Sequence, residues 1–179
     1  SHSSLLLTSS YEITNGMKEK ILGRMIVDDI TMAARTDSLI MKLGEKLYLK
    51  HVNLLQFNNY MSQKMRELGR FLIKARTIDS SIKTLTDVID AAKFPVAIQT
   101  TRLLCRYTAD INRYETPSFA LKIGHSLKKC CKLMKSNALI AGDSTIVEKA
   151  DSFHTLCAHE WGDVVSSNAL QTLQSKKMN

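Results

Sequence analysis

The stretch Tyr60–Arg76, YMSQKMRELGRFLIKAR, decides the fold class because its apolar residues recur at steps of three and four. Those apolar positions are Met61, Met65, Leu68, Leu72 and Ala75. Residues at this spacing share one face of an α-helix, so the stretch predicts an amphipathic helix that packs against other elements. The surrounding pattern extends this helix from about Leu54 to Ile78.

The composition of the chain agrees with a helical protein. Its 179 residues are enough for one buried core, and 44% hydrophobic with 23% charged residues is ordinary globular usage. Seven Gly and two Pro are too few for the many tight turns of a sheet-rich protein. We therefore expect an all-α fold, a single helical-bundle domain of about five to seven helices.

Residues 1–14 are rich in Ser and Thr and lack a helical period, which predicts a flexible arm or a cloning remnant. A helical domain is expected at 15–179, with Thr36 or Asp37 capping one helix and Thr116 followed by Pro117 starting another. Besides the opening stretch, the pattern predicts helices within residues 15–25, 36–52, 84–92, 93–107, 117–140 and 144–170. Trp161, the single tryptophan, is expected to anchor the core.

The charge of the chain points to a polyanionic partner. There are 25 Lys and Arg against 17 Asp and Glu, which gives a formal net charge of +8 and a pI of about 9.4. Such a field attracts nucleic acid first and anionic membrane second. No run of apolar residues is long enough for a membrane span, so no membrane association is expected.

Two predicted helices carry basic residues on one outward face. The first basic strip consists of Gln63, Arg66, Arg70 and Lys74, and the second of Lys122, His125, Lys129 and Lys132, with Lys128 and Lys135 at its margin. Glu67 is the one acid in the opening stretch, and no acid lies between Ser118 and Gly142. Like charges at this spacing repel by roughly 0.2–0.5 kcal/mol per pair, a cost that a bound polyanion would relieve. The alternative is that both strips are solvated faces.

Catalytic and metal chemistry find little support in the sequence. His154, Cys157 and His159 share a helix face, but zinc needs about four ligands and no second pair lies at ligand spacing. The four cysteines lie in apolar helical patterns, which predicts free, buried thiols in an intracellular protein. Gly69 and Gly124 each lie alone in a helix and predict close helix packing, so no cofactor is expected.

Four segments resemble parts of multi-copy animal proteins of mobile-element origin. They are YMSQKMRELGRFLIKA, KFPVAIQTTRLLC, PSFALKIGHSLKKC and WGDVVSSNALQTLQSKKMN, and the similarity covers about Gly23 to Asn179. In those proteins such a helical region precedes a Crypton-type tyrosine-recombinase-like catalytic domain. The resemblance implies a core-binding domain, the non-catalytic half of a clamp around DNA, in an intracellular and nuclear protein. No tyrosine here fits the family's catalytic pattern, so no catalytic residue is carried over and this chain is not expected to be an enzyme.

The basic strips and the resemblance together predict a domain that binds duplex DNA. Both basic strips would contact phosphates, which positions a protein without specifying a sequence. Asn58, Asn59 and Gln63 are candidates for reading base edges. The rival prediction is a helical protein-interaction or dimerisation module with an acidic partner. If the domain belongs to a larger parent protein, homo-oligomers could also form through that protein. A third alternative is an enzyme whose mechanism differs from the metal, cysteine and recombinase chemistry considered above.

Overall fold

The computed structural model describes residues 15–51 and 55–178. The described chain is helical apart from loops and one short β-hairpin, which confirms the all-α class. Its contacts gather into two compact units, one ending at Arg70 and the other beginning at Phe71, so the boundary lies inside α4 (Asn58–Ile78). The apolar pattern of α4 runs through this boundary without interruption, so the sequence gives no sign of it. The arm expected at residues 1–14 lies outside the described residues.

The unit that ends at Arg70 contains several short helices before α4. Its elements are a helical turn at 15–20, η1 (Leu22–Arg24), α2 (Asp29–Thr36), α3 (Ser38–His51), η2 (Leu55–Phe57) and the first part of α4. Helix α2 is not anticipated from the sequence, because its eight residues give too few apolar repeats for a clear period. Asp37 accepts a hydrogen bond from the Ile40 backbone N–H at 3.0 Å and so caps α3, as expected.

Two glycines allow the helices of this unit to approach closely. A Cβ on Gly44 of α3 would lie 2.7 Å from the Met65 sulfur of α4. A Cβ on Gly69 of α4 would lie 2.7 Å from the carbonyl oxygen of Ile30 in α2. Both distances are too short for a real side chain, so Gly69 serves helix packing, as the sequence predicts.

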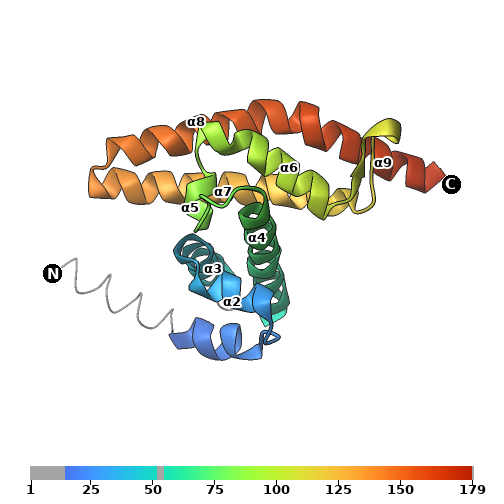
Figure 1. Ribbon diagram of the computed structural model, residues 1–179. Helices are drawn as coiled ribbons and strands as arrows, with labels where there is room; N and C mark the ends of the chain where they lie inside the picture. Colours follow the sequence, from blue (N-terminus) through green and yellow to red (C-terminus); the bar gives the residue numbers. More distant parts are fainter. Residues whose placement is uncertain (1–14, 52–54, 179) are drawn as a thin grey trace. The chain divides into compact units, whose positions relative to one another are not determined.

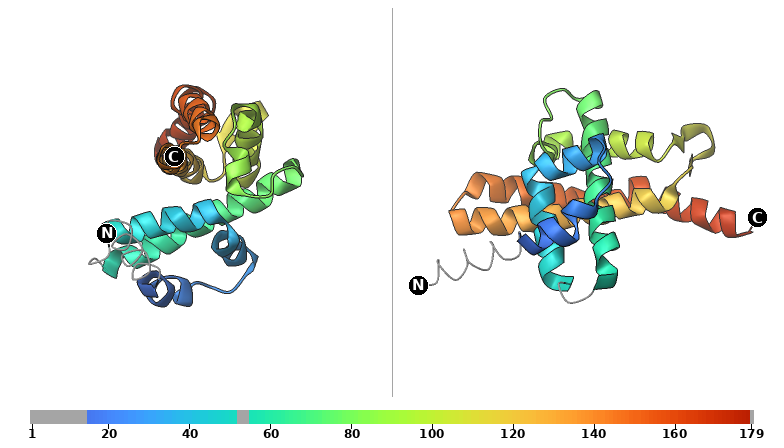
Figure 2. Two further views of the ribbon diagram at one scale, coloured as in Figure 1. Left: turned by 90° about the vertical axis from the view of Figure 1, so that its left-hand side faces the viewer. Right: turned by 90° about the horizontal axis from the view of Figure 1, so that it is seen from below.

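The unit that begins at Phe71 is built around a helical hairpin. Its elements after the end of α4 are α5 (Leu85–Val88), η3 (Ala91–Lys93), α6 (Phe94–Leu104), β1 (Tyr107–Thr108), η4 (Ala109–Ile111), β2 (Arg113–Tyr114), α7 (Pro117–Ala141), α8 (Ser144–Trp161), η5 (Gly162–Ser166, π-helical) and α9 (Ser167–Met178). Helices α7 and α8 run antiparallel side by side, and α9 continues the course of α8 (Figures 1 and 2). The last expected helix is thus divided by η5, which is one reason why the described helices outnumber the five to seven expected.

Aromatic side chains fill the core of this unit. Trp161 is 3% exposed and Phe153 is fully buried, and both lie edge-on to Phe94, with ring centroids at 6.3 and 5.7 Å. The Trp161 indole N–H donates a hydrogen bond to the Ala120 carbonyl oxygen at 3.4 Å. These contacts join α6, α7 and α8 and confirm that Trp161 anchors the core.

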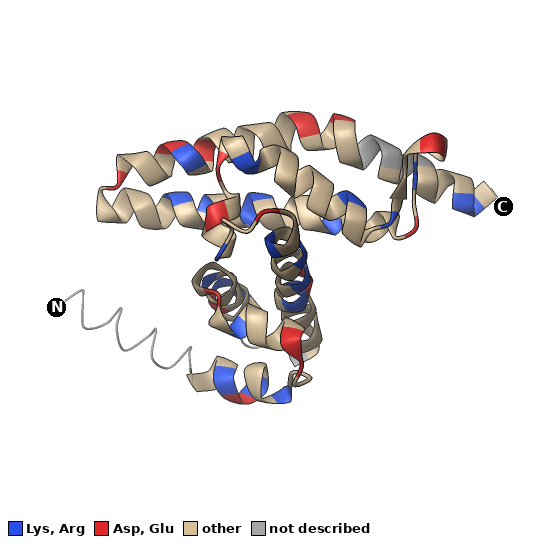
Figure 3. Ribbon diagram, in the orientation of Figure 1, with Lys and Arg blue, Asp and Glu red and all other residues tan. Residues whose placement is uncertain are grey.

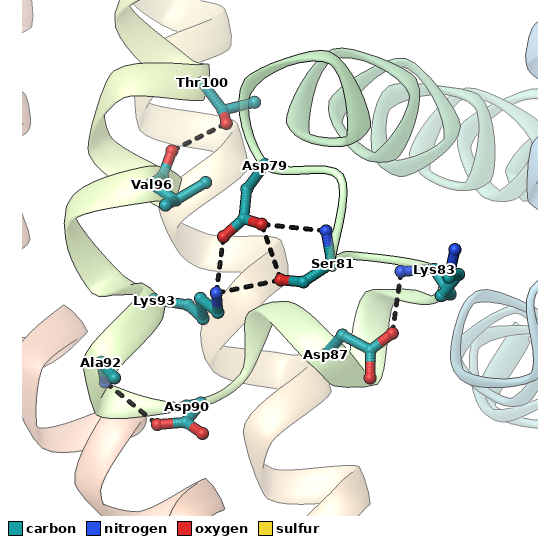
Figure 4. Close-up of polar contacts among 9 residues, drawn as sticks. All are labelled: Asp79, Ser81, Lys83, Asp87, Asp90, Ala92, Lys93, Val96 and Thr100. Atoms are coloured by element: carbon teal, nitrogen blue, oxygen red, sulfur yellow. Dashed lines mark hydrogen bonds and ion pairs between the residues drawn. The ribbon is translucent and has the colours of Figure 1, made fainter.

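A polar network fixes the loop between α4 and α6 (Figure 4). The Lys93 ammonium lies 2.5 Å from the Asp79 carboxylate and 3.0 Å from the Ser81 hydroxyl, which itself donates to Asp79 at 2.6 Å. The hydrogen bond from Lys93, and then those from Ser81, lower the pKa of Asp79 to about 2. Asp87 accepts from the backbone N–H of Thr84 at 2.9 Å, which confirms that a short helix begins near Thr84.

Residues 107–114 form a structure that the sequence does not predict. Tyr107 pairs with Tyr114, and Thr108 with Arg113, in a two-stranded antiparallel hairpin. The reversal includes Asn112, whose φ of 50° is a left-handed conformation that asparagine tolerates better than most residues. Two-residue strands are too short to show an alternating pattern, so the sequence shows only a polar segment with turn formers.

Candidate nucleic-acid interface

Helix α7 has clear start and stop signals. Pro117 occupies the first turn, where its missing N–H costs nothing, and Thr116 precedes it without a side-chain capping hydrogen bond. Gly142 ends the helix in the left-handed region, with φ 73°. Asp143 then caps α8 by accepting a hydrogen bond from the Ile146 backbone N–H at 3.2 Å. These signals set the two ends of α7, which has 25 residues and is the longest element among the residues that the structure describes.

The face of α7 that the sequence assigns to the core is buried. Its members Ile123, Leu127, Cys130, Cys131 and Met134 are each at most 6% exposed. Gly124 lies on this face, and a Cβ there would be 2.4 Å from the Trp161 indole nitrogen. The glycine therefore allows α7 and α8 to pack closely at Trp161, and the orientation of α7 about its own axis is fixed.

This orientation leaves the second basic strip outside the core. His125, Lys129 and Lys132 are exposed and Lys122 is half-buried. Within the described residues, Lys122, Lys129 and Lys132 make no ion pair or side-chain hydrogen bond. Basic residues alternate with uncharged ones along α7, and the acidic residues of the hairpin lie on α8 (Figure 3). The three lysines of the second basic strip therefore form a positively charged surface that no acid in the described part of the chain neutralises.

The margin of this strip meets α8. Lys135 forms an ion pair with Asp151 of α8, with 2.8 Å between ammonium nitrogen and carboxylate oxygen. This partner was not foreseen, because the two residues lie on different helices. A signal was available: the turn at Gly142 and Asp143 brings together residues about equally distant from it, which includes Lys135 and Asp151.

The first basic strip is different, because Arg66 already has an acidic partner within the chain. Both terminal nitrogens of Arg66 donate to the two carboxylate oxygens of Asp28, each at 2.8 Å. One of them also donates to the Thr31 hydroxyl at 2.6 Å, and the side chain is 22% exposed. The hydrogen bond from Arg66 holds the pKa of Asp28 well below its usual range. Helical periodicity relates residues of one helix, so it could not predict this contact between Arg66 of α4 and Asp28, which precedes α2.

The other members of the first basic strip differ in their exposure and in their hydrogen-bond partners. Gln63 donates a hydrogen bond to Glu67 at 3.1 Å, and buried Lys64 forms an ion pair with Glu67 at 3.3 Å. Arg70 is exposed and Lys74 is half-buried. Arg70 is the last residue of the first unit, and Lys74 belongs to the second unit. This strip offers fewer uncommitted cations than the second one.

A further row of cations lies on α3 and was not singled out in the sequence. Lys42, Lys46 and Lys50 recur every four residues, are exposed, and make no ion pair among the described residues. Glu45 interrupts this face, unlike the acid-free α7. The row is a weaker candidate and a suitable control for the second basic strip.

The cysteines do not form a nucleophilic site. All four, Cys105, Cys130, Cys131 and Cys157, are free and buried, as the sequence predicts. Burial raises the pKa of Cys157 to about 12 and also raises that of Cys131, so these thiols stay protonated at neutral pH. Within residues 15–51 and 55–178, no group of three His, Cys, Asp or Glu side chains could hold a metal ion.

Comparison of the sequence with protein-family models, with curated proteins and with solved structures finds no match. Across the described part of the chain, none of the helices combines the length and the apolar character that crossing a membrane requires.

Proposed function

We propose that this chain is a helical domain that binds duplex DNA, and that the second basic strip on α7 contacts the phosphate backbone. The observation that carries the proposal is the set of lysines Lys122, Lys129 and Lys132, which have no ion-pair partner among the described residues. They lie on an acid-free helix whose other face is buried in the core. Unpaired lysines along a rigid element gain binding energy from phosphates by releasing counterions from DNA.

The dimensions of the strip suit a duplex. At a rise of about 1.5 Å per residue, the segment from Lys122 to Lys132 spans roughly 15 Å. Duplex DNA carries one phosphate charge per about 1.7 Å of its axis when both strands are counted, so roughly nine phosphates lie along this length and some of them are on the side that faces the helix. Three ammonium groups can therefore each find a phosphate without distortion of the helix. Such contacts position the protein on DNA without reading its sequence.

The resemblance of four segments to Crypton-type proteins supports a finer form of the proposal. In that form the chain is the core-binding half of a tyrosine-recombinase-like clamp, and the catalytic half lies in a separate domain. Half of a clamp binds weakly, with a dissociation constant of roughly 10⁻⁴–10⁻⁶ M at physiological salt, the range of sequence-independent binding. The formal charge of +8 is in keeping with this role.

Fluorescence anisotropy with a labelled duplex over a series of salt concentrations tests the proposal. The wild-type chain should bind with a steep dependence on salt, and K122Q/K129Q/K132Q should reduce the log–log slope by up to about 2.7, or about 0.9 for each lost phosphate contact. The matched control K42Q/K46Q/K50Q removes the same charge from α3. Equal losses in both variants would indicate a net-charge effect, and unchanged binding by the α7 variant would reject the interface.

A protein-interaction module with an acidic partner is the second candidate. It is favoured by Leu139 and Ile140, which are 59% and 87% exposed at the end of α7, close to the second basic strip. An amphipathic acidic segment could cover the apolar pair and meet the lysines together. A concentration-dependent dimer in analytical ultracentrifugation that L139S/I140S abolishes, together with no DNA affinity, would favour this candidate.

A further inference from the structure

A small pocket lies between α7 and α8 at the margin of the second basic strip. It has a volume of about 170 Å³. Its lining residues are Cys131, Lys132, Lys135, Ala150, Asp151 and His154. Cys131 and Ala150 are 1% exposed and lie on the core side. The charged and titratable side chains are the outer members of the lining.

The charges around the pocket are predominantly positive. Lys132 is exposed and has no ion-pair partner among the described residues, whereas Lys135 is paired with Asp151 at 2.8 Å. Lys128 precedes Lys132 by one turn of α7 and is half-buried. Two ammonium groups and a single carboxylate thus line the pocket, and the charge of Lys128 also acts on His154. The excess of positive charge attracts an anion.

The lining of the pocket includes one histidine, His154. It is half-buried on α8, and its ring makes no hydrogen bond to any residue that the structure describes. Burial, followed by the charges of Lys132 and Lys128, lowers its pKa, while Asp151 acts in the opposite direction and Lys135 adds a smaller lowering. The imidazole is therefore neutral at physiological pH, with a nitrogen available to a ligand.

We propose that this pocket binds one phosphate group of the DNA backbone and that His154 takes up a proton when the phosphate binds. The proposal rests on the proposed DNA-binding function and names a contact within it. A phosphate between Lys132 and His154 would accept hydrogen bonds from both. Its negative charge would offset the repulsion that Lys128 and Lys132 exert on a protonated imidazole.

Linkage gives the direction of the resulting pH dependence. If His154 is neutral in the free protein and protonated in the complex, binding consumes one proton. Affinity then rises as the pH falls, by at most about tenfold per pH unit for a single proton. Backbone phosphate diesters do not titrate in the neutral range, so the dependence reports the protein.

The pocket itself can be tested on the wild-type chain with sulfate as the probe. Sulfate keeps its charge across the neutral range, so its binding also reports protein titration alone. We expect sulfate to shift the His154 ring signals in NMR spectra saturably, more strongly at about pH 5.5 than at about pH 7.5. Chloride at equal ionic strength should not do so, and His159, exposed on the same helix, is the internal reference. Parallel responses of both histidines to ionic strength alone would overturn the pocket.

Binding of duplex DNA then tests whether a phosphate of the DNA backbone occupies the pocket. Wild type and H159Q should bind the labelled duplex more tightly as the pH falls, and H154Q should lose most of that increase. His125 is retained in all three proteins, so its contribution is common to them. Circular dichroism checks that H154Q is folded, and the sulfate experiment stands without any variant.

The outcomes separate this inference from the proposed function. If H154Q keeps the wild-type pH dependence while the α7 lysines still determine the salt slope, the pocket assignment is overturned and the DNA-binding function stands. If sulfate binds at His154 but no duplex binds at any pH, the pocket takes a free anion and both DNA assignments fail. A pH dependence that requires His154, with a matching sulfate response, supports the inference.

Discussion

Arg66 and Asp28 form a bidentate ion pair, in which each terminal guanidinium nitrogen lies 2.8 Å from one of the two carboxylate oxygens. Asp28 also accepts a hydrogen bond from the Thr31 backbone N–H at 2.9 Å and so caps α2. The pair therefore ties the start of α2 to α4 within the unit that ends at Arg70. An arginine that resembles a DNA contact in the sequence is in this way part of the protein's internal structure.

The first prediction concerns the role of this pair in stability. Replacing Arg66 by Gln should lower the midpoint of urea denaturation, because Asp28 loses its charged partner and α2 loses its tie to α4. Arg35 is exposed on α2 and makes no ion pair among the described residues, so R35Q is the matched control. In the duplex assay R66Q should change the salt slope by less than the roughly 0.9 of a lost phosphate contact. A midpoint equal to that of R35Q would contradict the structural role.

The second prediction concerns acid stability. The folded-state pKa of Asp79 is about 2, below its ordinary value, so its carboxylate stabilises the fold fully above about pH 4. This stabilisation is lost as the pH falls through about 2. Urea midpoints should show D79N to be less stable than wild type near neutral pH, with a difference that shrinks towards zero in acid.

Asp110 provides the control for this measurement. It is exposed in η4, and its side chain makes no ion pair or hydrogen bond within the described residues. D110N should therefore follow the wild-type curve at every pH. If D79N and wild type differ by a constant amount down to the lowest pH, the Asp79–Lys93 contact does not titrate with folding.

The third prediction tests the close approach of α7 and α8. In G124A the new Cβ would lie 2.4 Å from the Trp161 indole nitrogen, so the helices must separate or the indole must move. We expect a loss of about 1–3 kcal/mol in the free energy of unfolding, the usual cost of overpacking a core. The tryptophan fluorescence should change as well, because Trp161 is the single tryptophan.

Gly162 is the matched glycine for this test. It has a helical φ of −56°, and a Cβ there would meet nothing within 4 Å. G162A should therefore change stability by no more than about 1 kcal/mol and leave the fluorescence as in wild type. Equal effects of both substitutions would show that Gly124 has no special packing role.

The fourth prediction concerns the thiols. All four cysteines are free and buried, and burial raises the pKa of Cys157 to about 12. Iodoacetamide at mildly alkaline pH should therefore modify the native chain slowly and the urea-unfolded chain rapidly at all four positions. Intact-mass spectrometry follows both reactions. Rapid modification of a single cysteine in the native chain would show that its site opens locally.

The sequence by itself determines the helical class, most helix starts and the buried face of α7. These features depend on local physics: apolar spacing at the helical period, a prolyl first turn at Pro117, and side-chain caps at Asp37 and Asp143. They need no knowledge of distant residues. For the same reason the sequence correctly predicts that Trp161 is buried and that the cysteines are free.

The tertiary structure alone decides which basic residues are uncommitted. A helical period shows that Arg66 and Lys129 each lie on a polar face, but the partner of a long side chain comes from elsewhere in the chain. Asp28, which is distant in sequence, forms an ion pair with Arg66 and neutralises its charge, whereas no acid among the described residues pairs with Lys129. The pocket beside His154 exists because two helices meet, and so does the ion pair of Lys135. The position of a charged residue can be read from the sequence, but whether an opposite charge pairs with it depends on the fold.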